Sequence, residues 1–282
     1  MEMALSTQLM YSVMYVEMLD GTHKPIGSAT GFLFGFYGEG NSLIPCLVTN
    51  RHVLTQCAFV KIPVILQNDD GTPDIGNAVP VEISTSGSIN HPKPDVDLSI
   101  LPIAPVINWF TQNGKFPFYK IFSIDTIPSE EEWQRFSAIE NVVMAGFPRG
   151  FRDEKNNQPI IRSGITATNP SLDFNGKPVF LVDMPCFEGC SGSPVLICDE
   201  GLILNKRDHS IGVGNSVKLL GVQFAIPSDD VVGKFAPVKT GATIVPVVPL
   251  YMSLGYIIKS TELLAFESIL RAEYGSPPIT HT

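Results

Sequence analysis

Short apolar segments alternate with segments rich in glycine, proline and polar residues along most of the chain. Apolar runs bounded by turn-forming residues predict β-strands. We expect strands at 14–18, 28–36, 43–48 and 95–101. In 95–101, acidic or small residues alternate with apolar ones, which predicts a strand with one exposed and one buried face. The pattern as a whole predicts an all-β protein.

Two helices interrupt this pattern. Ser129, followed three positions later by Glu132, is a capping-box signature, which predicts a short helix between the two groups of strands. Ser260 is predicted to cap a second helix near the end of the chain. The apolar face of that helix consists of Leu263, Phe266, Ile269 and Leu270.

One uncharged stretch, 241–258, reaches the lower length limit of a membrane-spanning helix. Pro246, Pro249 and Gly255 interrupt it, so we expect edge strands or an irregular crossover there instead. The net charge of −9 argues against nucleic acid or an anionic membrane as the main partner. We therefore expect neither partner.

The composition suits one compact unit with a large core. A chain of 282 residues with 44% hydrophobic content can bury a large core, and 24 glycines and 23 prolines supply the turns of a β protein. No basic region precedes an apolar core near the N-terminus, so we expect no secretory signal and a cytoplasmic location. The five cysteines form no metal-ligand pattern, so we expect reduced thiols, no metal and no cofactor.

The most informative motif runs from Glu188 to Pro194 and places Ser191 between glycines. Gly189 and Gly192 allow backbone conformations that a side chain would forbid, so that amide groups can converge on the oxygen of a substrate carbonyl. A serine on such a turn is a candidate acyl-transfer nucleophile. The motif alone is also compatible with an ordinary loop.

Two further segments carry residues that a serine nucleophile needs. His52 follows the apolar segment 43–48, so a strand delivers its imidazole to the edge of a sheet. Asp97 lies in the alternating segment 95–101, and Asp95 remains the fallback on the same strand face. The chain order is histidine, aspartate, serine.

These motifs resemble the chymotrypsin-like (trypsin-fold) serine peptidases, in particular the bacterial trypsin-like group. The glycine-rich segment 27–33 resembles the early strand that leads to the histidine, 141–148 resembles the strand that opens the second barrel, and 219–225 resembles the strand after the nucleophile. The resemblance covers most of the chain. It implies two six-stranded antiparallel β-barrels, a short helix between them and a C-terminal helix.

The resemblance also implies a division of the chain. Residues 1–125 would form the first barrel with His52 and Asp97, 126–139 a linker with the short helix, 140–257 the second barrel with Ser191, and 258–282 the C-terminal helix and tail.

The activity implied is that of a serine endopeptidase acting on polypeptides. Ser191 would attack the scissile carbonyl, His52 would accept the proton, and Asp97 would hold the imidazole in the productive tautomer. The amides of Gly189 and Ser191 would form the oxyanion hole. Residues expected to contact substrate are Phe187, Glu188, Val222, Gln223, Phe224 and Ala225. The pocket floor near Pro185 lacks an acid, which favours a small or hydrophobic residue before the cleaved bond.

Cys190 departs from the family pattern, because digestive members carry an aspartate before the serine that pairs with a newly cut N-terminal amine. We therefore do not expect activation by propeptide cleavage. Cys190 is itself an alternative nucleophile, displaced by one residue. Two other readings stay open: an inert trypsin-fold module that binds a peptide or protein, and a peptidase that stays latent until a protein activator binds.

Overall fold

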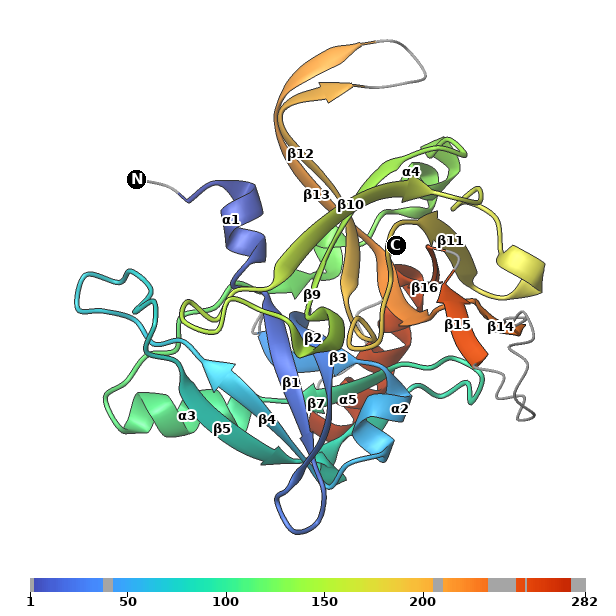
Figure 1. Cartoon of the computed structure of the whole chain (residues 1–282). Helices are drawn as coiled ribbons and strands as arrows, with labels where there is room; N and C mark the ends of the chain where they lie inside the picture. The colour runs from blue at the N-terminus through green and yellow to red at the C-terminus, as the bar shows by residue number, and fades with distance from the viewer. Residues whose placement is uncertain (1–2, 38–42, 205–209, 233–246, 252, 275–282) are drawn as a thin grey trace, which may run out of the picture.

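The computed structural model describes residues 3–37, 43–204, 210–232, 247–251 and 253–274. Two β-sheets make up most of the molecule, and short helices lie around them (Figure 1). The prediction of a mostly β protein built on two sheets is confirmed.

The first sheet contains eight strands, in the order β5-β4-β1-β2-β3-β7-β6, with β8 paired in parallel with β2. Its longest members are β1 (Val13–Leu19), β2 (Pro25–Tyr37) and β3 (Leu43–Thr49). The others are β4 (Phe59–Val64), β5 (Val79–Ser84), β6 (Ile89–Asn90), β7 (Ser99–Pro102) and β8 (Phe122–Ser123). Within the described residues, β5 and β6 do not pair with each other. The first sheet thus differs from the expected six-stranded barrel.

The second sheet closes into a ring of six strands, in the order β10-β11-β16-β13-β12-β9. These strands are β9 (Asn141–Gly146), β10 (Ile160–Thr166), β11 (Val179–Asp183), β12 (Pro194–Leu204), β13 (Ile211–Ala225) and β16 (Leu254–Lys259). The long strands β12 and β13 form a hairpin that projects away from the rest of the molecule (Figure 1). A separate pair consists of β14 (Ser228–Val232) and β15 (Val247–Tyr251).

Strand β2 explains how the two sheets are joined. It is buried on both faces from Ala29 to Phe36, because its alternating side chains enter two different cores. Leu33 packs with the helices and strands of the first sheet, whereas Phe32, Phe34 and Phe36 enter a core shared with the second sheet. Fully burying one such side chain contributes about 1.5–3 kcal/mol. The shared core therefore fixes the relative position of the two sheets.

Five α-helices complete the described fold: α1 (Leu5–Leu9), α2 (Arg51–Thr55), α3 (Ala104–Gln112), α4 (Glu130–Arg135) and α5 (Ala265–Tyr274). Ser129 caps α4 through its side chain, and Glu132 bonds back to the Ser129 amide, so the predicted capping box is present. The Phe266 ring of α5 lies 6.2 Å from that of Phe36 and so closes the shared core. No helix in the described residues is long and apolar enough to cross a bilayer.

Several short turns of 3₁₀-helix connect these elements: η2 (Thr85–Gly87), η3 (Ile124–Thr126), η4 (Pro148–Gly150), η5 (Phe174–Gly176) and η6 (Ser260–Leu264). The prediction that Ser260 caps the last helix is wrong. Ser260 begins η6 and is fully buried, and α5 begins only at Ala265.

Two predicted strands differ in extent. Of the segment 95–101, only residues 99–101 lie in a strand, at the start of β7, because Asp97 and its neighbours turn toward the start of α2 instead of pairing with β3. In 241–258, β15 belongs to a two-stranded sheet and is an edge strand as expected, whereas β16 lies inside the second ring between β11 and β13. Residues 241–246 lie outside the described part of the chain.

Candidate active site

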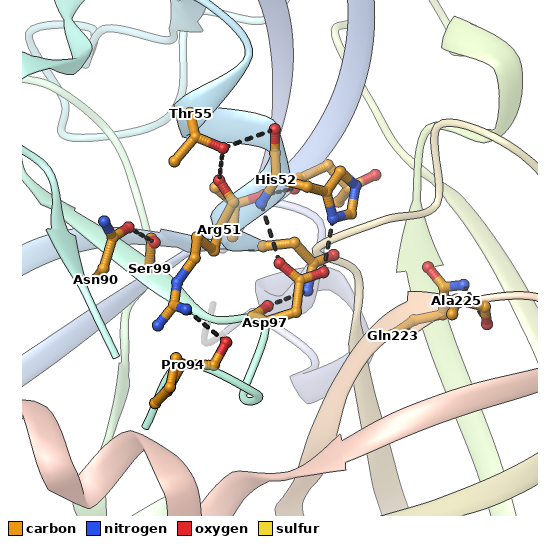
Figure 2. A network of polar contacts seen from close by, with 12 residues as sticks. Arg51, His52, Thr55, Asn90, Pro94, Asp97, Ser99, Gln223 and Ala225 are labelled. Carbon is orange, nitrogen blue, oxygen red and sulfur yellow. Dashed lines mark hydrogen bonds and ion pairs between the residues drawn. The ribbon is translucent and has the colours of Figure 1, made fainter. Parts of the chain in front are cut away.

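The start of helix α2 brings His52 and Asp97 together. The His52 Nδ1 lies 2.6 Å from the Asp97 Oδ2, and the His52 amide donates to the Asp97 Oδ1 at 2.9 Å (Figure 2). The Asn50 side-chain amide donates to the Asp97 backbone carbonyl at 2.8 Å. One carboxylate thus holds both the ring and the backbone of the histidine. In a neutral ring this leaves Nε2 as the proton acceptor, since Nδ1–H faces the carboxylate.

Arg51 fixes the loop that carries Asp97. Its guanidinium donates to the Pro94 carbonyl at 2.7 Å (Figure 2). It also donates to the backbone carbonyls of His91 at 2.5 Å and Lys93 at 3.2 Å. Multiple donors in a fixed planar fork suit a guanidinium to this task. Asp95, the fallback on sequence, is exposed, and the segment is a loop and not a strand. The structure therefore selects Asp97 over Asp95 as the partner of His52.

The loop before β12 holds Ser191 at the junction of the two sheets. The Ser191 carbonyl accepts from the Thr30 amide of β2 at 2.9 Å, and the Gly192 amide donates to the Gln223 carbonyl of β13 at 2.9 Å. Gly192 has a φ of +88°, and a Cβ there would lie 2.0 Å from the Thr30 carbonyl oxygen and 2.4 Å from the Thr49 hydroxyl. Only glycine fits this close approach.

The three predicted catalytic residues are not all joined by hydrogen bonds. Ser191 is half-buried, and its neighbour Gly192 packs against Thr49 in the segment that leads into His52. Among the described residues, the Ser191 hydroxyl forms no hydrogen bond with His52. Hydrogen bonds between a nucleophile and its base are often loose in the absence of substrate.

The amides of Gly189 and Ser191, predicted to form the oxyanion hole, lie in a turn whose neighbouring backbone groups are hydrogen-bonded. Gly189 has a φ of +84° and lies in a turn closed by the Cys190 amide, which donates to the Phe187 carbonyl at 3.1 Å. The Glu188 carbonyl accepts from the Arg149 amide at 2.6 Å. Within the described part of the chain, neither the Gly189 amide nor the Ser191 amide donates a hydrogen bond. Both donors are thus unoccupied, as oxyanion binding requires.

The thiol beside the serine is poorly suited to act as a nucleophile. The Cys190 side chain is fully buried, and burial raises the pKa of its thiol. Burial also raises the pKa of Cys186 to about 12. Because the thiolate is the reactive species, both groups stay protonated and unreactive near neutral pH. All five cysteines are free thiols.

A cavity of about 360 Å³ lies beside the end of β13. Its lining consists of Phe174, Asn175, Lys177, Val179, Phe224, Ala225 and Tyr256. Phe224 and Ala225 were expected to contact substrate and do line this cavity. The side chains of Val222 and Gln223 are fully buried and do not line this cavity, and their contact with substrate stays a prediction.

The remaining substrate-contact predictions lie on the other side of Ser191 in sequence. Glu188 is exposed, and Phe187 is half-buried with the guanidinium groups of Arg149 and Arg162 near its ring. Sequence reasoning assigned no role to either arginine or to Thr30, whose hydroxyl donates to the Gly189 carbonyl at 2.8 Å. Nothing in the local pattern marks these residues, because each contacts a segment distant in sequence.

Solved structures similar to this chain include several proteases. The MamO protease domain from Magnetospirillum magneticum, in its apo form, is 13% identical, with 93% of this chain and 98% of that chain covered and a TM-score of 0.45. HL collagenase is 15% identical, with 96% of each chain covered and a TM-score of 0.48. The scabies mite inactivated protease paralogue S-I1 is 13% identical, with 94% of this chain and 96% of that chain covered and a TM-score of 0.45.

No curated protein sequence matches the chain. Residues 29–204 match the sequence model of the trypsin-like peptidase domain, and this span includes His52, Asp97 and Ser191. The match extends over more than half of the chain, so the protein belongs to the trypsin-like peptidase family.

Proposed function

We propose that the chain is a serine endopeptidase that hydrolyses peptide bonds through Ser191, His52 and Asp97. The observation that carries this proposal is the double hydrogen bond from His52 to the Asp97 carboxylate, at 2.6 Å and 2.9 Å. A structural ion pair needs only one such contact. Two contacts fix both the ring orientation and the tautomer, which a general base requires.

The reaction follows from these roles. The Ser191 Oγ attacks the scissile carbonyl carbon while the His52 Nε2 accepts the hydroxyl proton, and Asp97 stabilises the imidazolium that forms. The carbonyl oxygen becomes an oxyanion that the Gly189 and Ser191 amides stabilise. His52 then gives the proton to the leaving amine, and an acyl-enzyme remains. Water, deprotonated by His52, hydrolyses the acyl-enzyme and regenerates the Ser191 hydroxyl.

The cavity at the end of β13 favours an apolar substrate side chain. Phe224, Tyr256 and Phe174 contribute aromatic surface, with the Phe224 and Tyr256 ring centroids 6.1 Å apart and those of Phe174 and Tyr256 6.2 Å apart. A cavity of about 360 Å³ is large enough for one bulky side chain of a polypeptide. We propose that it holds a hydrophobic residue of the substrate near the cleaved bond.

Labelling with a fluorophosphonate probe tests the proposal without knowledge of the substrate, because the oxygen of an activated serine displaces fluoride from phosphorus and keeps the phosphonyl group. We expect the wild-type protein to be labelled and Ser191→Ala to be unlabelled. Cys190→Ala is the matched control and keeps its label, since the buried thiol takes no part in the reaction. Labelling that survives in Ser191→Ala and is lost in Cys190→Ala would assign the nucleophile to the thiol.

The same assay separates the two other readings. A folded wild-type protein that resists the probe under all conditions is an inert binding module, and the proposal is then wrong. Label that appears only after a cellular extract is added indicates a peptidase that an activator switches on. Label on the pure protein removes the need for an activator.

A further inference from the structure

Two arginines hold the segment that precedes the nucleophile loop. The Arg162 Nη1 donates to the Pro185 carbonyl at 2.5 Å, and its guanidinium carbon lies 4.8 Å from the centre of the Phe187 ring. The Arg149 guanidinium carbon lies 5.7 Å from the same ring, and the Arg149 amide donates to the Glu188 carbonyl at 2.6 Å. We call Arg149 and Arg162, with their contacts to residues 185–188, the arginine clamp.

The clamp sets the direction of one amide that the proposed reaction needs. A trans peptide is planar, and its carbonyl and its N–H point in opposite directions. Because the Glu188 carbonyl is held by the Arg149 amide, the N–H of Gly189 in the same peptide faces away from Arg149. Rotation of this peptide by half a turn would break that hydrogen bond and remove the amide from the oxyanion hole.

The packing beneath this peptide is tight. An added Cβ on Gly189 would lie 2.6 Å from the Phe147 carbonyl oxygen and 2.7 Å from the Arg149 nitrogen. Arg149 itself has a φ of +50°, a left-handed conformation that few residues other than glycine adopt. Backbone strain of this kind persists only where surrounding contacts compensate for it. The contacts of the clamp supply that compensation.

The guanidinium of Arg162 contacts the segment before Ser191 and does not pair with a carboxylate of the described residues. Among the described residues, no carboxylate lies within ion-pair distance of Arg162. Its contacts include the Pro185 carbonyl and the Phe187 ring. A carbonyl dipole and an aromatic face are both favourable partners for a guanidinium. Arg162 therefore anchors the loop through polar contacts that an apolar side chain could not replace.

We propose that Arg162 is a positioning residue that keeps the Glu188–Gly189 peptide in the orientation required for oxyanion stabilisation. This inference rests on the proposed peptidase function. The oxyanion exists only in the transition state and the tetrahedral intermediate, so loss of the clamp lowers kcat and leaves KM nearly unchanged. Complete loss of one oxyanion donor lowers kcat by about 10²–10³. We expect a loss of at least about tenfold when the Gly189 amide is present but no longer held in place.

The test compares Arg162→Met with Arg162→Lys on a peptide substrate selected from a library with the wild-type protein. We expect Arg162→Met to lower kcat at least about tenfold with KM within about twofold of wild type. Lysine keeps the charge and one donor for the Pro185 carbonyl, so Arg162→Lys recovers part of the loss. Arg135→Met is the control, since that exposed guanidinium pairs with Glu131 on its own helix and, within the described ranges, with no other carboxylate.

A second variant keeps the inference testable if Arg162→Met folds poorly. Arg162→Ala leaves space for a free guanidinium ion, and we expect added guanidinium at millimolar concentration to restore part of kcat. A merely structural role would give no such rescue in a folded variant. Unchanged kcat in Arg162→Met, or a raised KM with unchanged kcat, overturns the inference while the peptidase function stands. A wild-type protein that does not cleave or label overturns the proposed function itself.

Discussion

Replacing Asp97 with asparagine keeps a side chain of the same shape beside His52 but changes which nitrogen of the imidazole carries the proton. The carboxylate accepts from the His52 amide through one oxygen and from the ring Nδ1 through the other. An asparagine can accept only one of these bonds. If its oxygen stays with the backbone amide, its NH₂ group faces Nδ1, which must then be the unprotonated nitrogen. The proton moves to Nε2, and the ring can no longer accept the serine proton.

The expected cost is large for the reaction and small for stability. In a serine peptidase with this arrangement, the same exchange lowers kcat by about 10⁴, which corresponds to about 5 kcal/mol of transition-state stabilisation. The His52 and Asp97 side chains are 38% and 24% exposed, and a pair so open to solvent contributes about 0–1 kcal/mol to folding. Asp97→Asn should therefore be folded and nearly inactive.

The assay is the second-order rate of fluorophosphonate labelling, measured beside urea unfolding of the same preparation. Asp95→Asn is the matched control, because it removes the same charge from an exposed position two residues away. We expect the rate to fall by several orders of magnitude in Asp97→Asn and to stay near wild type in Asp95→Asn. Equal losses in the two variants, or no loss in Asp97→Asn, would refute the assignment of His52 as the base.

Two further predictions concern stability. Thr30→Val should lower the free energy of unfolding by about 2–6 kcal/mol, because the buried hydroxyl donates to the Gly189 carbonyl and accepts from the Phe147 amide, and each of these two groups left unpaired costs about 1–3 kcal/mol. Urea unfolding measures this loss. Thr30→Ser should stay close to wild type, and equal losses in the two variants would contradict the argument. Burial lowers the pKa of His91 below 6.5 despite the nearby Glu262. As the pH falls below about 6.5, His91 therefore takes up a proton in the unfolded chain before it does so in the folded protein, and the free energy of unfolding decreases. In urea titrations between pH 7 and 5, His91→Gln should lose less stability than wild type, and an unchanged slope would show that His91 is not responsible.

Much of the β framework was accessible from the sequence because it depends on local periodicity. The strands at 14–18 and 28–36 lie within β1 and β2, and the capping box at Ser129 begins α4 as predicted. These features need only neighbours along the chain. The position of His52 just after an apolar strand could also be predicted, since β3 ends at Thr49 and α2 begins at Arg51.

What the sequence did not reveal depends on contacts between distant segments. The alternation in 95–101 predicts a strand, but the attraction of Asp97 to the start of α2 outweighs that local preference. Ser260 has the chemistry of a helix cap, yet the chain there continues as a 3₁₀ turn and buries the side chain. Arg162 carries no local signal, because its partner Pro185 is 23 residues away.

The core shared between the sheets has a consequence for biosynthesis. Phe32, Phe34 and Phe36 share this core with Leu263 and Phe266, which are synthesised much later along the chain. Until then these aromatic side chains lack their final neighbours, and the junction that carries Ser191 lacks firm support. The contacts that fix this junction are therefore complete only after the segment with Leu263 and Phe266 has been synthesised.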